Sequence, residues 1–115
     1  MKKNFLEKLK MPKIINDRAV VMSEYGGYVL NTENHVWSDK TFGYKKMKNK
    51  KELEEAYVSL IKDQLIPLKE SGLCAAVYTQ TTDVEIEING FYTYDREVLK
   101  MNKEVVRKVN LEVIK

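Results

Sequence analysis

An amphipathic helix between two short apolar runs limits the possible folds of this chain more than any other feature. One side of residues 50–70 is apolar at helical spacing, through Leu53, Ala56, Tyr57, Leu60, Ile61, Gln64, Leu65 and Leu68. The runs at residues 19–24 and 73–80 indicate buried strands before and after this helix. A strand, a helix and a second strand usually form a right-handed parallel unit. The sequence therefore predicts an α/β fold with parallel strands.

The ends of this helix carry recognisable signals. Asn49 is expected to cap its start, with Glu52 three residues later in a capping-box arrangement. Pro67 lacks a backbone N–H and is expected to kink the last turn. Gly72 suits the position just beyond the helix, where the chain adopts positive φ.

Weaker signals precede the helix. Residues 4–10 are expected to form a short helix that ends before Pro12. Residues 28–48 are expected to form a long loop between the Gly26-Gly27 turn and the main helix. Loops of that length are uncommon in compact domains and are often functional.

After the second strand, the chain carries a turn signal and a final helix. Apolar residues on both sides of Asn89-Gly90 are expected to pair as a hairpin across this turn. Asn102 is expected to cap the last helix, whose apolar side contains Val105, Val106, Val109, Val113 and Ile114.

A carboxylate and several aromatic side chains are expected to gather at the carboxyl ends of the two strands. Glu24 ends the first strand, and Tyr78 and Gln80 end the second. Ligands of parallel α/β folds bind at this edge, so Glu24 is a candidate for chemistry. The alternative is a solvated Glu24 that only caps a strand. Nearby rings, such as Tyr25 and Trp37, either pack against a sugar or pin the loop to the sheet.

Five segments occur in an order that resembles a known family. They are VVMSEYGG, HVWSDKTFGY, KKELEEAYVSLIKDQLIPLKESGL, CAAVYTQTTDVE and NGFYTYDREVLK. Over residues 17–115 the chain resembles the end of the catalytic (β/α)₈ barrel of glycoside hydrolase family 2, the β-galactosidase and β-glucuronidase group. The resemblance implies that residues 1–115 are a single segment, the C-terminal fragment of a TIM barrel with its last two strand–helix units. A whole barrel needs about 250 residues, and the chain has 115.

The resemblance also implies site roles. Glu24 matches the nucleophile of a retaining mechanism, and Tyr25, Trp37, Tyr78 and Gln80 are implied to bind the carbohydrate substrate. Tyr78 stands where many family members carry a tryptophan. Retaining enzymes need a second carboxyl group about 5 to 5.5 Å away. The family's second group follows an asparagine at an earlier strand, outside this chain, so the isolated chain is expected to be inactive.

Two further carboxylates lie near the inferred site. Asp83 and Glu85 are the only alternatives that the sequence places there. The resemblance gives neither of them the acid/base role.

Composition argues against several other functions. The 20 basic and 17 acidic residues give a net charge of only +3, and the lysines of residues 45–51 precede acidic residues, as in a solvated loop and helix start. No nucleic-acid partner is therefore expected. No apolar stretch approaches 18 residues, so no membrane span is expected. The single cysteine, Cys74, is expected to be buried, and the single histidine, His35, has no ligand spacing for a metal. No cofactor is expected.

The exposed parts of the expected fragment also predict self-association. Two strands cut from a barrel expose edges and an apolar helix face, and such edges template pairing with another chain. The chain is therefore expected to form a homo-oligomer through these edges or faces.

The alternative function is a free-standing small α/β binding or interaction module in which Glu24 is structural.

Overall fold

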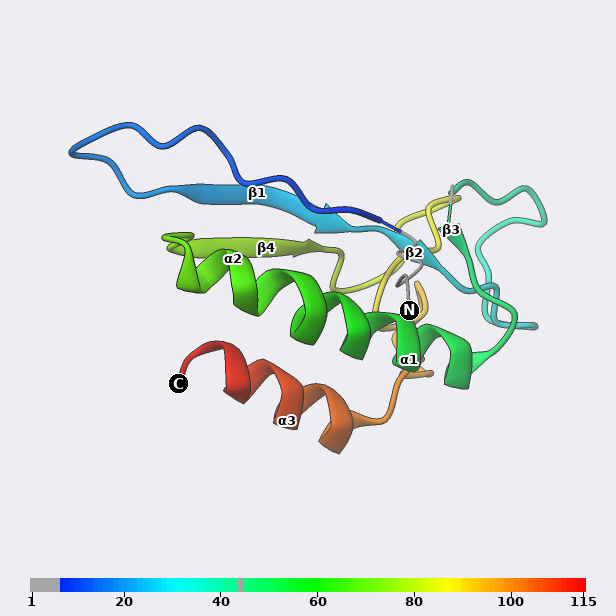
Figure 1. Ribbon diagram of the computed structural model, residues 1–115. Helices are drawn as coiled ribbons and strands as arrows, with labels where there is room; N and C mark the ends of the chain where they lie inside the picture. The colour runs from blue at the N-terminus through cyan, green and yellow to red at the C-terminus, as the bar shows by residue number, and fades with distance from the viewer. Residues whose placement is uncertain (1–6, 44) are drawn as a thin grey trace.

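A parallel strand pair and a long helical segment organise the molecule. The computed structural model describes residues 7–43 and 45–115 (Figure 1). The elements, in chain order, are β1 (Val21–Gly26), β2 (Tyr28–Val29), β3 (Lys45–Lys46), α1 (Lys50–Ser59), the π-helix η1 (Leu60–Leu65), α2 (Ile66–Glu70), β4 (Ala75–Thr79) and α3 (Lys103–Val113).

The two main strands are parallel, as predicted. β1 pairs with β4 from Val21 opposite Ala75 to Gly26 opposite Thr79, with a register shift between Met22 and Tyr25. The helical segment of α1, η1 and α2 connects them. An α/β fold with parallel strands and helices is therefore confirmed. The expected long loop also contains two short strands, because β2 and β3 pair in parallel within it.

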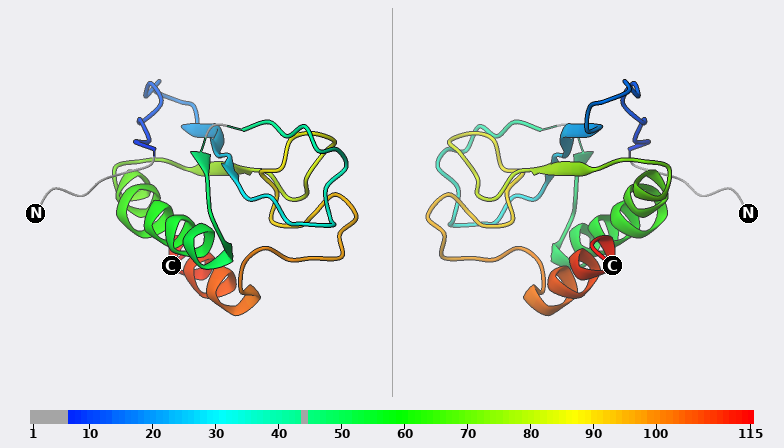
Figure 2. Two further views of the ribbon diagram at one scale, coloured as in Figure 1. Left: turned by 90° about the vertical axis from the view of Figure 1, so that its right-hand side faces the viewer. Right: turned by 90° about the vertical axis from the view of Figure 1, so that its left-hand side faces the viewer.

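One face of the sheet packs against the helices. Figures 1 and 2 show the α1–α2 segment beneath the sheet, with α3 alongside it. Tyr25 and Met22 of β1 belong to the same buried cluster as the inward face of the helical segment. The largest fully buried side chains on these helices are Leu53, Tyr57, Leu60 and Ile61. Their burial provides the main apolar contribution to stability.

The other face of the sheet is open to solvent. Val21 on β1 and Val77 on β4 are 45% and 55% exposed. Cys74 is exposed as well. The expectations of buried strands and of a buried cysteine are wrong for this side of the sheet, because no described element covers it. An apolar sequence run signals a strand but does not report how many of its faces are packed.

The long helical segment is capped at the predicted residues, although no hydrogen bond from Asn49 N to the Glu52 side chain completes a capping box among the described residues. The side-chain oxygen of Asn49 accepts a hydrogen bond from Glu52 N at 2.8 Å. Gly72 follows α2 with a φ of +117°. The backbone N–H groups of Gly72 and Leu73 donate to Lys69 O and Leu68 O, both at 3.0 Å. This double closure is the pattern by which a glycine at positive φ satisfies the last carbonyls of a helix.

A π-helix precedes Pro67. Within residues 60–65 the helix widens, and Ile66 N donates to Ile61 O, five residues earlier. A proline ring clashes with the carbonyl four residues before it and leaves that carbonyl without a donor. Widening the preceding turn is one way in which a helix accommodates this clash. The predicted distortion therefore extends further toward the N-terminus than the last turn.

The N-terminal segment is not helical where it is described. Residues 7–10 form no helix, and residues 4–6 of the expected helix lie outside the described part. Instead, Leu9 N donates to Gln64 Oε1 at 2.7 Å, and Gln64 Nε2 donates to the carbonyl of Glu7. A buried glutamine of η1 thus satisfies this backbone, and the helix prediction is wrong because a tertiary partner replaces the local one.

A buried ion pair holds the segment after β4, where a hairpin was expected. Asp83 Oδ1 accepts hydrogen bonds from Lys100 Nζ and Gly90 N, both at 2.7 Å. Lys100 Nζ also donates to Ile88 O at 3.0 Å. The backbone of Asn89 and Phe91 pairs with Gln80. The segment therefore folds around Asp83, which is buried, and the predicted hairpin does not form.

The electrostatics of this pair reflect its burial. Burial raises the pKa of Asp83 and lowers the pKa of Lys100, because water solvates each charge better than the protein interior does. The ion pair opposes both shifts. Asp83 is thus committed to a structural contact, which removes it from the expected alternatives for acid/base chemistry.

The final helix begins as predicted. Asn102 Oδ1 accepts hydrogen bonds from Glu104 N and Val105 N at 2.9 and 3.3 Å.

In the described part of the chain, no helix combines the length and apolar character needed to cross a bilayer.

Candidate functional site

A cleft of about 470 Å³ lies at the carboxyl ends of β1 and β4. The strand ends contribute Glu24, Tyr25 and Thr79 to it, and the turn after β1 contributes its two glycines. Flanking segments add Glu7, Phe42, Gly43, Lys45, Glu87 and Asn89. Its position matches the edge at which parallel α/β folds bind ligands.

Glu24 is an exposed carboxylate in this cleft. It sits where the β1–β4 register shifts, between Met22 and Tyr25. Among the described residues, its side chain has no hydrogen-bond or ion-pair partner. A carboxylate in such a position is chemically available as a nucleophile or base.

The turn after β1 depends on glycine. Gly26 has a φ of +92°, and a Cβ atom there would lie 2.2 Å from Cε2 of Tyr78. Only glycine permits both this backbone conformation and such a close approach to the ring. Gly26 therefore fixes the direction in which the chain leaves Glu24.

A lysine and a second carboxylate form one wall of the cleft. Lys45 Nζ lies 3.3 Å from Glu7 Oε2 and 5.7 Å from the centre of the Tyr28 ring. Glu7 Oε2 also accepts from Gly26 N at 3.2 Å. This contact links the N-terminal segment to the turn beside Glu24. Sequence reasoning missed both residues, because neither segment carries a motif that signals a site.

The tyrosines predicted to bind substrate lie in an aromatic cluster. Tyr25 is buried and lines the cleft. Its ring packs edge-on to Tyr78 at 5.4 Å, and Tyr78 stacks on Phe91 at 4.8 Å. Tyr78 contacts Tyr57 edge-on as well, at 5.1 Å. Such aromatic pairs contribute to stability beyond the area they bury.

Burial keeps the phenols of this cluster neutral. It raises the pKa values of Tyr25 and Tyr78 well above the usual 10, and it raises the pKa of Tyr57 to about 12. The Tyr57 hydroxyl donates to Asn110 Oδ1 at 2.6 Å. These groups can therefore act as hydrogen-bond donors but not as bases near neutral pH. Of the three, only Tyr25 lines the cleft, whereas Tyr57 and the predicted substrate-binding residue Tyr78 line a separate groove.

The remaining predicted residues differ in their relation to the cleft. Gln80 Nε2 donates to Asn89 Oδ1 at 2.6 Å and so positions a cleft residue. Trp37 is 56% exposed and does not line the cleft. Glu85, the other expected carboxylate, does not line it either, whereas Glu87 does.

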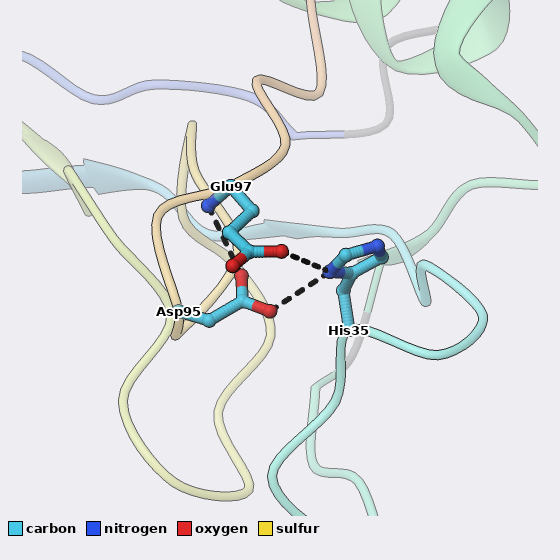
Figure 3. Close-up of side chains that lie close together, drawn as sticks. All are labelled: His35, Asp95 and Glu97. Carbon is cyan, nitrogen blue, oxygen red and sulfur yellow. Dashed lines mark hydrogen bonds and ion pairs between the residues drawn. The ribbon is translucent and has the colours of Figure 1, made fainter.

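A second cluster of ionisable side chains lies outside this cleft. His35 Nδ1 is 2.8 Å from Asp95 Oδ2 and 3.9 Å from Glu97 Oε2 (Figure 3). Asp95 Oδ1 accepts hydrogen bonds from the Thr93 hydroxyl and from Glu97 N. The Thr93 hydrogen bond, followed by that of His35, lowers the pKa of Asp95 from 3.8 to about 2.

This shift predicts a pH-dependent contribution to stability. A carboxyl group whose pKa falls on folding stabilises the protein above its unfolded pKa, and this stabilisation disappears as the pH falls through the folded pKa. Asp95→Asn is therefore expected to lower the melting temperature above about pH 4, with a difference that shrinks as the pH falls toward about 2 and disappears only below it. Thermal unfolding followed by circular dichroism across this range measures it. Asp39→Asn, which removes another loop carboxylate, is the control, and an undiminished difference at about pH 2 would contradict the assignment.

Comparison with known proteins identifies no family for this chain. No protein-family model matches the chain, and a search of curated proteins finds no similar sequence.

Proposed function

We propose that this chain contributes the last two strand–helix units of a retaining glycoside hydrolase barrel related to family 2, with Glu24 as the nucleophile. The reaction is hydrolysis of a β-glycosidic bond in a carbohydrate. The observation that carries the proposal is the cleft containing Glu24 at the carboxyl ends of two parallel strands. Active sites of (β/α)₈ barrels lie at this end of the strands.

The open face of the sheet supports the same proposal. In a barrel, one face of each strand contacts the outer helices and the other faces the barrel interior. Here the helices cover only one face, while Val21 and Val77 on the other face are exposed. Six further strands would cover these side chains.

Glu24 would attack the anomeric carbon, and a second carboxyl group would protonate the leaving oxygen. Asp83 is buried against Lys100, and Glu85 lies outside the cleft. Of the other carboxylates in the cleft, Glu7 is paired with Lys45 and bound to Gly26 N. Glu87 also lines the cleft. The resemblance, however, implies an acid/base residue that follows an asparagine at an earlier strand, so the general acid is assigned to the strand–helix units that this chain does not supply.

The isolated chain is expected to show no measurable hydrolysis of aryl β-galactosides or β-glucuronides. Loss of a general acid alone typically lowers the rate by about 10² to 10⁴-fold, and loss of substrate positioning lowers it further. A chromogenic assay at micromolar protein measures this. Turnover within about tenfold of a typical enzyme rate of 1 to 10³ s⁻¹, abolished by Glu24→Gln, would contradict the assignment of the acid. The positive test joins this chain to the missing barrel units and asks whether hydrolysis depends on Glu24.

A binding or interaction module remains the second candidate. A groove of about 440 Å³ between β4 and α3 favours it, because apolar and aromatic side chains dominate its lining. If this chain joined to the missing barrel units folds but shows no hydrolysis, the binding or interaction function replaces the glycoside hydrolase function.

For the isolated chain, we propose the homo-oligomer expected from the sequence. Because Val21 and Val77 are exposed, its interface is assigned to the open face of the sheet rather than to a strand edge or an apolar helix face. Val77→Lys places a charge on that face and is expected to shift the chain toward a 13.5 kDa monomer. Val84→Lys is the matched control, because Val84 is similarly exposed but lies outside the sheet. Light scattering at micromolar concentration measures the mass. A monomeric unsubstituted chain, or an equal effect of the two variants, would contradict this interface.

A further inference from the structure

His35, Asp95 and Glu97 bring three potential metal ligands together from two distant segments. His35 and Asp95 are 60 positions apart in the sequence. The imidazole nitrogen and one oxygen from each carboxylate all lie within 4.8 Å of one another. Figure 3 shows both carboxylates directed toward the same side of the His35 ring. The spacing of the single histidine gave no sign of a metal site, because its partners become neighbours only in the folded chain.

The spacing of these atoms suits a small divalent cation. Zinc bonds of about 2.1 Å in a tetrahedral arrangement place neighbouring ligand atoms about 3.4 Å apart. The observed separations of 2.8 Å to Asp95 and 3.9 Å to Glu97 lie on either side of this value. The distances from Nδ1 therefore each differ from the ideal value by about half an ångström, and all three ligand atoms lie within 4.8 Å of one another, so small side-chain rotations would bring them around a common cation.

The surroundings hold Asp95 in a ligand-like orientation. The short loop that carries it is closed by a bridge between Tyr92 and Leu99 and by a hydrogen bond from Thr93 N to Val98 O at 3.0 Å. Thr93 is fully buried, and its hydroxyl donates to Asp95 Oδ1. The other oxygen, Oδ2, is the one that faces His35. Outer hydrogen bonds of this kind orient ligating carboxylates and tune metal sites.

We propose that His35, Asp95 and Glu97 form a binding site for a first-row divalent cation of the zinc type. One imidazole nitrogen with two carboxylate oxygens favours such a cation over Mg²⁺, which prefers oxygen ligands alone. Binding at Nδ1 requires the neutral imidazole to carry its proton on Nε2, which points away from both carboxylates in Figure 3. Three protein ligands leave a fourth position for water, as in open zinc sites.

Such a site would link residues 28–48, the long segment between β1 and α1, to the segment before α3. His35 lies within residues 28–48, which also carry Trp37 and Phe42. The hydrogen bond between His35 and Asp95 already joins the two segments. A cation would replace this bond with three stronger ones, so metal binding would reduce the motion of the loop.

The test uses the full chain, with Zn²⁺ as the probe, in a Cys74→Ser background because the exposed thiol also binds zinc. Glu97→Gln removes one ligand without touching the His35–Asp95 bond, and its side chain is 70% exposed, so the fold should persist. Glu70→Gln, at the exposed end of α2, is the matched control. Isothermal titration calorimetry gives affinity and stoichiometry. Because the chain has one histidine, the proton NMR signals of its imidazole report directly on His35.

The expected result is one Zn²⁺ per chain, a shift of the His35 ring signals, and affinity at least about tenfold weaker in Glu97→Gln but unchanged in Glu70→Gln. Affinity should also fall on acidification, because protons compete for the ligands. Unmoved imidazole signals, equal affinity in Glu97→Gln, or equally tight binding of Mg²⁺ would each overturn the proposal. The three side chains would then serve only as a hydrogen-bonded link between the loops.

Discussion

Joining residues 17–115 to the first six strand–helix units of a family 2 barrel is expected to produce hydrolysis of aryl β-glycosides that depends on Glu24. Under the proposed function, the added units would supply the general acid and most of the sugar pocket, while this chain would supply the nucleophile. Glu24→Gln keeps the shape of the side chain but removes its nucleophilic oxygen. We expect it to lower kcat by at least about 10³-fold, as is typical when a covalent mechanism loses its nucleophile.

The control for this experiment is Glu85→Gln. Glu85 is exposed and lies outside the cleft, so its replacement should leave kcat within about twofold, as for a surface substitution. Circular dichroism of each variant confirms folding. A folded, joined barrel that is inactive, or that remains active in Glu24→Gln, would overturn the assignment of Glu24.

Lys100→Met is expected to lower the free energy of unfolding by about 3 to 5 kcal/mol. Removing one partner of a buried ion pair leaves the other charge without compensation, and the cost is typically of this size. Asp83 would lose the Nζ donor at 2.7 Å and keep only Gly90 N. The carbonyl of Ile88 would also lose its lysine donor. Urea unfolding followed by tryptophan fluorescence or circular dichroism measures the change.

Two further variants make this prediction specific. Lys108→Met replaces an exposed lysine of α3 and should change stability by no more than about 0.5 kcal/mol. The double variant Asp83→Leu with Lys100→Met removes both charges and should regain part of the loss. If Lys100→Met costs less than about 1 kcal/mol, the pair contributes no more than a surface contact.

Local signals in the sequence predicted the long helical segment, the final helix and the strand pair well. Asn49 and Asn102 cap their helices through side-chain contacts within three residues, and Gly72 ends α2 in the expected conformation. The apolar runs before and after the long helical segment became β1 and β4. These features depend on neighbours in the sequence or on regular spacing, so a single sequence contains the information needed to predict them.

Contacts between distant residues decided the features that the sequence did not predict. Asn89-Gly90 is a strong turn signal, yet a Cβ atom at Gly90 would lie 2.3 Å from Asp83 N, so the glycine allows close backbone packing instead. Residues 7–10 satisfy their backbone through Gln64 rather than through a helix. In the cleft, Glu24 was predicted from its position after a strand, whereas Lys45 and Glu7 meet only through the tertiary fold.

The parallel pairing of β1 with β4 has a consequence for the order of folding. Val21 meets Ala75 only after about fifty residues of chain have been brought into a loop, and closing such a loop is entropically costly. The α1–η1–α2 segment forms through local contacts inside that loop and shortens the distance between its ends. Contacts of high sequence separation slow folding. The helical segment is therefore expected to fold ahead of the strands, and the cleft around Glu24 is among the last parts of the molecule to assemble.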